Sequence, residues 1–279
     1  MILTEKMVFD FGVYLFENEK SELTIEKYIR DVGFFLRFTG GRETDKAMVL
    51  AYKSYLEQQY AVASANSMIA SVNAFLRFLG LTEFQVRQFK VQKQIFRPAQ
   101  KELSKAEYIR LCRTAEASGN ERLSMILQTV CGTGIRISEL KFITVKAVKS
   151  AGAVVSCKNK TRTVFIVREL QKKLLRYCRK NGIESGAVFV TRTGKPMNRT
   201  NVWREMKGLC ERAGVDPGKV FPHNLRHLFA KVFYEIEKDI AKLADILGHS
   251  SINTTRIYII STGTEHRSRM EKMGLILLN

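Results

Sequence analysis

Cysteine, proline and tryptophan are scarce in this chain of 279 residues, which holds 5, 4 and 1 of them respectively. The cysteines are scattered, odd in number and form no C-x-x-C pair. This pattern argues against a disulfide framework and against a zinc site, and it favours free thiols in a reducing compartment.

Long apolar runs are missing as well. No stretch approaches the roughly 20 apolar residues that cross a bilayer, and the N-terminus lacks a signal-peptide pattern. We therefore expect a cytoplasmic protein. A hydrophobic content of 45% excludes a wholly disordered chain. The length favours about two domains.

Acidic residues are few beside basic ones: the chain has 27 Asp and Glu and 46 Lys and Arg, which gives a formal net charge of +19. Such an excess predicts a polyanionic partner. A basic membrane-surface protein is the alternative, but no segment pairs a cationic face with a strongly apolar one. Nucleic acid is therefore the favoured partner.

Helical periodicity dominates the first 95 residues or so, with apolar positions recurring at helical spacing over 23–38, 48–60 and 63–79. Residues 87–110 are strongly basic and are interrupted by Pro98, which indicates an interdomain connector. Ser104 and Glu107 then form the S-x-x-E pattern of a capping box at the start of a new helix.

The second part of the chain has a mixed pattern. A hairpin is predicted over 153–167, with a polar Lys-Asn-Lys turn between two strands, and a short strand over 187–191. Helices are predicted over 105–117, 121–130, 170–181 and 201–213.

Residues 221–258 contain three of the four histidines, and His223, Arg226 and His227 share one helical face at i, i+3 and i+4. His249 follows a glycine that ends a helical run, and Tyr258 lies nine residues further on. Concentrated His, Arg and Tyr indicate a site that handles phosphate.

Other candidates lie upstream. Arg136 stands in G-T-G-I-R with Glu139 as its nearest partner, and Lys158 and Lys160 lie at the predicted hairpin turn. Taken singly, each has an ordinary structural explanation, such as an ion pair for Arg136 or a solvated turn for the lysines.

Taken together, four segments resemble the tyrosine recombinase family, which includes phage integrases and Xer-like recombinases. They are GTGIRISEL (132–140), HNLRH (223–227), LGH (247–249) and TTRIY (254–258). The resemblance extends over nearly the whole chain. It implies a mainly α fold with a small β-sheet. A helical, SAM-like core-binding domain would span 1–95, and an α+β catalytic domain would span 96–279.

The resemblance also implies roles for individual residues. Tyr258 would be the nucleophile, and Arg136, Arg226 and His249 would hold the scissile phosphate. His223 would be a proton shuttle or a further phosphate ligand.

The hairpin lysine of the family would act as general acid toward the leaving 5′ oxygen. Cys157 falls where that lysine commonly lies, so Lys158 is favoured on a turn shortened by one residue, with Lys160 second. Glu237 stands where a glycine is often found before the LGH segment.

By the same resemblance, the enzyme would cut and rejoin recombination sites in double-stranded DNA through a 3′-phosphotyrosyl intermediate. Two guanidinium groups suit the charge that builds on the phosphate oxygens, and no metal or other cofactor is expected. A non-catalytic DNA-binding regulator and a type IB topoisomerase-like relaxing enzyme are the alternatives.

The resemblance also implies that a homotetramer would act on two duplexes. The apolar tail 274–278 either packs on its own domain or, as the resemblance implies, docks onto a neighbouring subunit.

Overall fold

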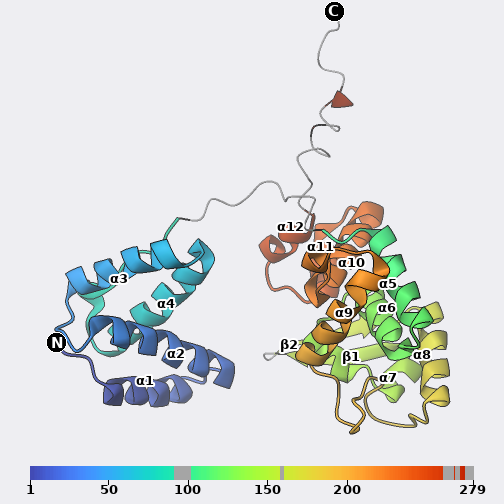
Figure 1. Cartoon of the computed structure of the whole chain (residues 1–279), viewed down its shortest axis with the longest axis horizontal. Coiled ribbons are helices and arrows are strands. Elements are labelled where there is room, and N and C mark those ends of the chain that lie inside the picture. The colour runs from blue at the N-terminus through green and yellow to red at the C-terminus, as the bar shows by residue number, and fades with distance from the viewer. Residues whose placement is uncertain (91–101, 158–159, 260–266, 268–270, 274–279) are drawn as a thin grey trace, which may run out of the picture. The chain divides into compact units, whose positions relative to one another are not determined.

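Two units, Met1–Lys93 and Gln94–Asn279, make up the chain (Figure 1). The computed structural model describes residues 1–90, 102–157, 160–259, 267 and 271–273. Each unit has a buried apolar core of its own. Among the residues described, every helix is too short or too polar to span a lipid bilayer.

The first unit is helical. Thr4 and Asp45 cap two of its helices, since their side chains accept hydrogen bonds from the backbone N–H groups of Met7 and Met48. Its core is aromatic, with Phe11, Phe35 and Phe75 among the fully buried side chains. Its helices are α1 (Glu5–Glu17), α2 (Glu22–Thr39), α3 (Lys46–Gln59) and α4 (Val62–Phe78), followed by the 3₁₀ turn η1 (Thr82–Phe84).

The second unit places one two-stranded antiparallel sheet among helices. Its strands are β1 (Gly152–Cys157) and β2 (Lys160–Phe165), paired from Gly152 with Phe165 to Cys157 with Lys160. The helices before the sheet are α5 (Lys105–Ala117), α6 (Glu121–Thr133), η3 (Ile137–Phe142) and α7 (Val145–Lys149). Those after it are α8 (Arg168–Lys180), α9 (Arg199–Ala213), η4 (Pro217–Lys219), α10 (Pro222–Glu237), α11 (Ile240–Leu247) and α12 (Ile252–Ile259).

The predicted fold class, mainly α with a small sheet, is confirmed. So is the capping box, because Ser104 accepts from the N–H of Glu107 while the Glu107 carboxylate accepts from the N–H of Ser104. The strand predicted over 187–191 is wrong: Ala187 and Val190 form only isolated bridges, to Thr144 and Pro196. Val188 and Phe189, which lie between them, are buried. The apolar run therefore reflects packing in the core and not strand pairing in a sheet.

Candidate active site

Helix α10 carries the most deeply buried cation of the site, Arg226, with 2% of its surface exposed. Pro222 occupies the first turn of the helix, as the sequence predicts. The Arg226 guanidinium donates to the backbone oxygens of Gly134 and Leu247, the latter at 2.6 Å. These carbonyls end α6 and α11, and the C-terminus of a helix favours positive charge. Arg226 therefore joins three helices at one point.

Glycines at both helix ends let the backbone reach the arginines. Gly134 has a φ of +65°, and a Cβ there would lie 2.5 Å from Cδ1 of Phe229. Gly248 has a φ of +64°, and a Cβ there would lie 2.5 Å from Cδ of Arg162. Any side chain at either position would move the groups that surround the arginines.

Glu139, only 1% exposed, holds two further guanidinium groups. Its Oε1 accepts from Arg136 and Arg162 at 3.0 Å each, and its Oε2 accepts from Arg162 at 2.8 Å. Burial alone would raise the pKa of this carboxyl, but the hydrogen bonds from Arg162 and Arg136 outweigh burial and lower the pKa. The carboxylate thus stays charged and fixes both arginines.

Arg136 lies just beyond the end of α6, as its position after two glycines suggests. Its Nη2 donates to the oxygen of Gly248 at 3.3 Å, and 36% of its side chain remains exposed. Arg162, on β2, donates through Nε to the oxygen of Ile246 and is far less exposed, at 13%. Arg136 is therefore the more accessible of the two guanidinium groups.

Helix α12 brings Tyr258 into this cluster, with 3% of its surface exposed. Its hydroxyl lies 3.1 Å from Nε2 of His223. The rings of His223, His227 and His249 have their centroids 5.3, 5.3 and 5.5 Å from that of Tyr258. The phenol is therefore surrounded by three imidazoles.

His249 connects the tyrosine helix to Arg226. The Arg226 guanidinium can only donate, so Nε2 of His249 accepts from it at 3.0 Å, and Nδ1–H donates to Oγ1 of Thr255 at 2.9 Å. Burial, followed by the nearby Arg226, Arg136 and Arg162, lowers the pKa of His249 to about 4. His249 is consequently a neutral ring of defined tautomer near pH 7.

Burial and the neighbouring Arg136 lower the pKa of Arg226 to about 10, so this guanidinium remains charged at neutral pH. Three arginines and one carboxylate leave the cluster strongly positive. Within the described part of the chain, no group of three or more His, Cys, Asp or Glu could hold a metal ion.

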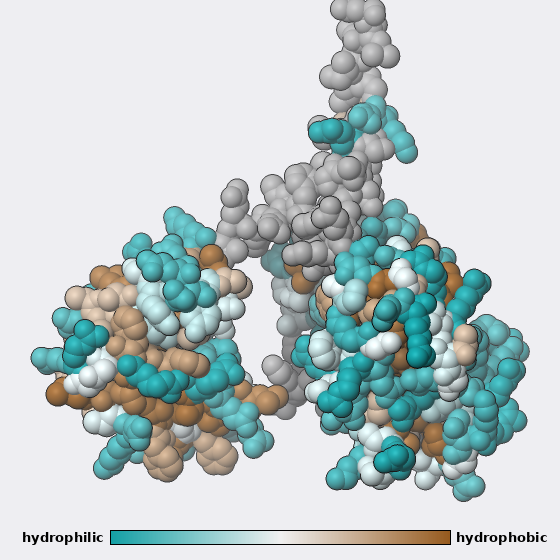
Figure 2. Space-filling model, in the orientation of Figure 1, coloured by the Kyte–Doolittle hydropathy of each residue, from teal (hydrophilic) through white to brown (hydrophobic). Residues whose placement is uncertain are grey.

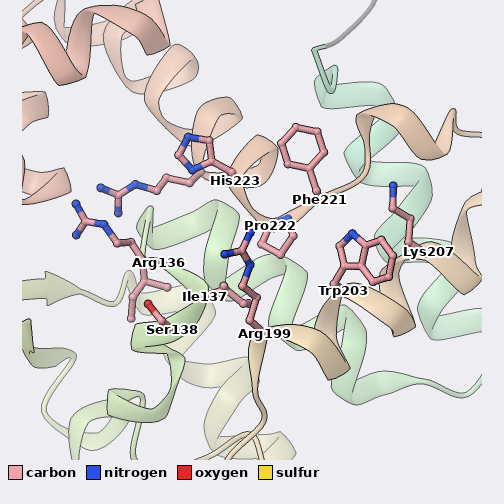
Figure 3. Close-up of a pocket in the computed structure, with 11 residues that line it drawn as sticks. Arg136, Ile137, Ser138, Arg199, Trp203, Lys207, Phe221, Pro222 and His223 are labelled. Carbon is pink, nitrogen blue, oxygen red and sulfur yellow. The ribbon is translucent and has the colours of Figure 1, made fainter. Parts of the chain in front are cut away.

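A pocket of about 460 Å³ opens beside the cluster (Figure 3). Arg136, His223 and Arg226 line one part of it, and side chains of α9 line another. A pocket lined by several cationic groups is suited to an anion such as a phosphodiester.

Five of the six predicted site residues therefore converge in space: Arg136, His223, Arg226, His249 and Tyr258. The sixth, Lys158, lies outside the described residues, and so does the side chain of Lys160. The partnership of Arg136 with Glu139 is confirmed.

Sequence reasoning gave no role to Arg162 or Thr255, although both contact site residues. The available signal for Arg162 was the K-x-R pattern of the hairpin. Nothing comparable marks Thr255, whose contact depends on how α12 returns to His249.

Comparison with known proteins adds independent evidence. Residues 101–265 match the phage integrase family. The chain belongs to that family.

Tyrosine recombinase XerA of Pyrococcus furiosus is 28% identical to this chain over 284 residues, covering 98% of this chain and 96% of the relative. A crystal structure of XerA recombinase aligns over 99% of this chain and 100% of its own, with 26% identity and a TM-score of 0.55. The Tn1549 transposon integrase, solved in complex with circular intermediate DNA, aligns over 96% and 99% with a TM-score of 0.73. At 17% identity, that last likeness concerns the fold alone. The prediction of a tyrosine site-specific recombinase is confirmed.

Proposed function

We propose that this recombinase cuts DNA by attack of the Tyr258 hydroxyl oxygen on a phosphodiester. The phosphorus–oxygen bond to the 5′ side breaks, Tyr258 becomes joined to the 3′ phosphate, and a free 5′ hydroxyl leaves. Attack of a 5′ hydroxyl on that phosphotyrosine restores a DNA strand without an external energy source. The observation that best supports this proposal is the position of the Tyr258 hydroxyl. It lies 3.1 Å from Nε2 of His223 and within the cluster of Arg136, Arg226 and His249.

Each group has a part in this proposal. Arg136 and Arg226 line the pocket and bind the non-bridging oxygens, whose charge grows during attack. His223 accepts the tyrosine proton, which a free phenol with a pKa of about 10 releases poorly. His249 lies between Arg226 and Thr255. The negative charge of a bound phosphate raises the pKa of His249, so that Nε2 takes up a proton and donates a hydrogen bond to the phosphate.

The leaving 5′ oxygen needs a proton. We assign this step to Lys158, which follows β1 in the sequence, with Lys160, the first residue of β2, as the second candidate. This assignment rests on the family pattern.

Double-stranded DNA is the proposed partner, with the unit ending at Lys93 as the core DNA-binding domain and the unit beginning at Gln94 as the catalytic domain. The net charge of +19 supports it, since phosphate contacts dominate the affinity of such proteins. A DNA substrate and the free thiols of Cys112, Cys131, Cys178 and Cys210 are consistent with a place of action in the cytoplasm.

We further propose that the enzyme assembles as a homotetramer on two duplexes. Helix α1 presents Phe9, Val13 and Phe16 at i, i+4 and i+7, with 71, 44 and 73% of their surfaces exposed. Figure 2 shows apolar surface gathered on the first unit. Contiguous exposed apolar side chains are typical of contacts with another protein. The tail 274–278, proposed to dock onto a neighbouring subunit, lies outside the described residues.

The test begins with selection of duplexes that the protein binds from a random-sequence pool. A selected duplex is then nicked so that cleavage releases a short fragment and traps the covalent adduct. The wild-type protein should form the adduct, and Tyr258→Phe should form none while binding the duplex within about threefold of wild type, because only the nucleophilic oxygen is lost.

Tyr234→Phe is the matched control, since Tyr234 lies on α10 and lacks the contact to His223. It should retain adduct formation. An adduct in the Tyr258→Phe protein would remove Tyr258 from the mechanism. Adduct formation on every duplex, without selectivity, would instead favour a relaxing enzyme.

A further inference from the structure

Helix α9 contributes a second set of side chains to the pocket. Arg199, Trp203 and Lys207 all line it, together with the phosphate-binding candidates Arg136 and His223 (Figure 3). They are spaced four residues apart, so they form one stripe with a rise of about 6 Å from each to the next. The adjacent face of α9 carries the buried Val202 and Met206.

Core packing does not explain this stripe. Arg199 is exposed, and it has no hydrogen-bond or ion-pair partner in the part of the chain that the structure describes. Trp203, the only tryptophan of the sequence, is 47% exposed. An exposed aromatic ring and an exposed, unpaired guanidinium in one pocket suit a ligand that has both an apolar face and an anionic group.

Lys207 holds the ring in place. Its ammonium lies 5.7 Å from the centroid of the Trp203 indole and donates to the backbone oxygen of Pro217. A cation near the ring face restrains the indole, so that the rest of its surface stays available to a ligand. The stripe is thus arranged before any ligand binds.

We propose that Arg199 and Trp203 bind a nucleotide of the DNA strand next to the scissile phosphate. Arg199 binds the neighbouring phosphate, and the Trp203 ring packs against the deoxyribose and base edge of that nucleotide. An anion site and a flat apolar surface, a few ångströms apart along one pocket, match the alternating phosphate and sugar–base of one strand. The inference rests on the proposed function, because it takes the scissile phosphate to lie at Arg136 and Arg226.

This subsite predicts two separate effects on binding. Loss of one phosphate contact makes the slope of log K against log salt less negative by about 0.9. Loss of an aromatic contact weakens binding by roughly tenfold at any salt concentration. A purely structural role for Arg199 would change stability without changing the salt slope.

The experiment uses the full-length wild-type chain and a short random-sequence duplex at about 50 mM salt, where phosphate contacts dominate binding. Because Trp203 is the sole tryptophan, its fluorescence reports this position directly. Saturating DNA should lower the acrylamide quenching constant by at least about twofold, since a packed nucleotide covers one side of the ring. Arg199→Ala should reduce the salt slope by about 0.9, and Arg199→Lys should restore it.

Arg179→Ala is the matched control, because Arg179 is an exposed arginine on α8, outside the pocket. It should leave the slope unchanged, and Trp203→Phe should bind more tightly than Trp203→Ala. Unchanged quenching at saturation, or equal slope changes in the Arg199 and Arg179 variants, would overturn the proposal.

Both readouts, the quenching constant and the salt slope, are independent of covalent trapping at Tyr258. An active recombinase with unprotected Trp203 would therefore refute the subsite alone, and protection without an adduct would refute the cleavage mechanism alone.

Discussion

His249 shows how the cationic environment of the site controls a single side chain. Arg226, Arg136, Arg162 and His223 all face it, and burial with these charges lowers its pKa from 6.5 to about 4. The folded protein therefore resists protonation of His249, whereas the unfolded chain protonates it near pH 6.5. A bound phosphodiester would supply the missing negative charge and raise this pKa again.

The consequence for stability has a definite sign. Between pH 6.5 and about 4 the unfolded chain binds more protons at His249 than the folded one, so stability falls as the pH falls through this window. We expect the melting temperature of the DNA-free wild-type protein to drop more between pH 6.5 and pH 5 than that of His249→Gln, whose side chain stays neutral. Thermal denaturation of both proteins across the window tests this. Parallel melting curves would show that His249 is not the titrating group.

The candidate site residues could be located in the sequence because their spacing is local, whereas their roles came from the resemblance to the family. His223 and Arg226 share a helix turn, and Arg136 lies three residues from Glu139. The second function of Glu139, holding Arg162 from a strand 23 residues away, depends on the tertiary fold and has no local signal. The same holds for the hydrogen bond from His249 to Thr255.

At the scale of elements, the turn between α10 and α11 departs from usual helix endings. By the resemblance to the family, Glu237 stands in place of a glycine, but Glu237 is the last residue of α10. The left-handed residue is the next one, Lys238, with a φ of +57°. A lysine in this conformation carries a steric cost that glycine does not.

Lys238→Gly should therefore stabilise the protein by about 0.5–1 kcal/mol, since relief of the left-handed strain exceeds the added entropy of the unfolded chain. Lys242→Gly is the control: Lys242 lies within α11, where glycine costs about 1 kcal/mol. Urea denaturation should show shifts of opposite sign. A destabilised Lys238→Gly protein would mean that the contact of Lys238 with the Tyr234 ring outweighs the backbone strain.

Elements with strong end signals were predictable, and those without were not. The helix predicted over 105–117 matches α5, because its capping box fixes the start. Helix α12 carries Tyr258, but its sequence is weakly amphipathic and rich in threonine and isoleucine. Its sequence therefore contains no periodic pattern that predicts a helix. Its helical form matters, because it turns the tyrosine back toward His223.

At the scale of the whole molecule, each unit has its own buried apolar clusters. One cluster joins residues between Leu3 and Val86. A larger one joins residues between Leu103 and Leu225, and a small third one joins Ala230, Leu243, Leu247 and Tyr258. The first contains Phe11, Phe35 and Phe75, all fully buried. A separate core of this kind is the physical condition for a segment to fold without the rest of the chain.

Residues 1–93, expressed alone, should accordingly unfold in one cooperative urea transition, with an m-value of roughly one third of that expected for the full length, because m scales with the surface exposed. Phe35→Ala should destabilise this fragment by about 3–5 kcal/mol, since it leaves a cavity among buried aromatic rings. Phe34→Ala is the control, because the Phe34 side chain is 41% exposed and should matter little. Circular dichroism during urea titration provides the measurement. A gradual, non-cooperative loss of helix in the wild-type fragment would show that its stability depends on the remainder of the chain.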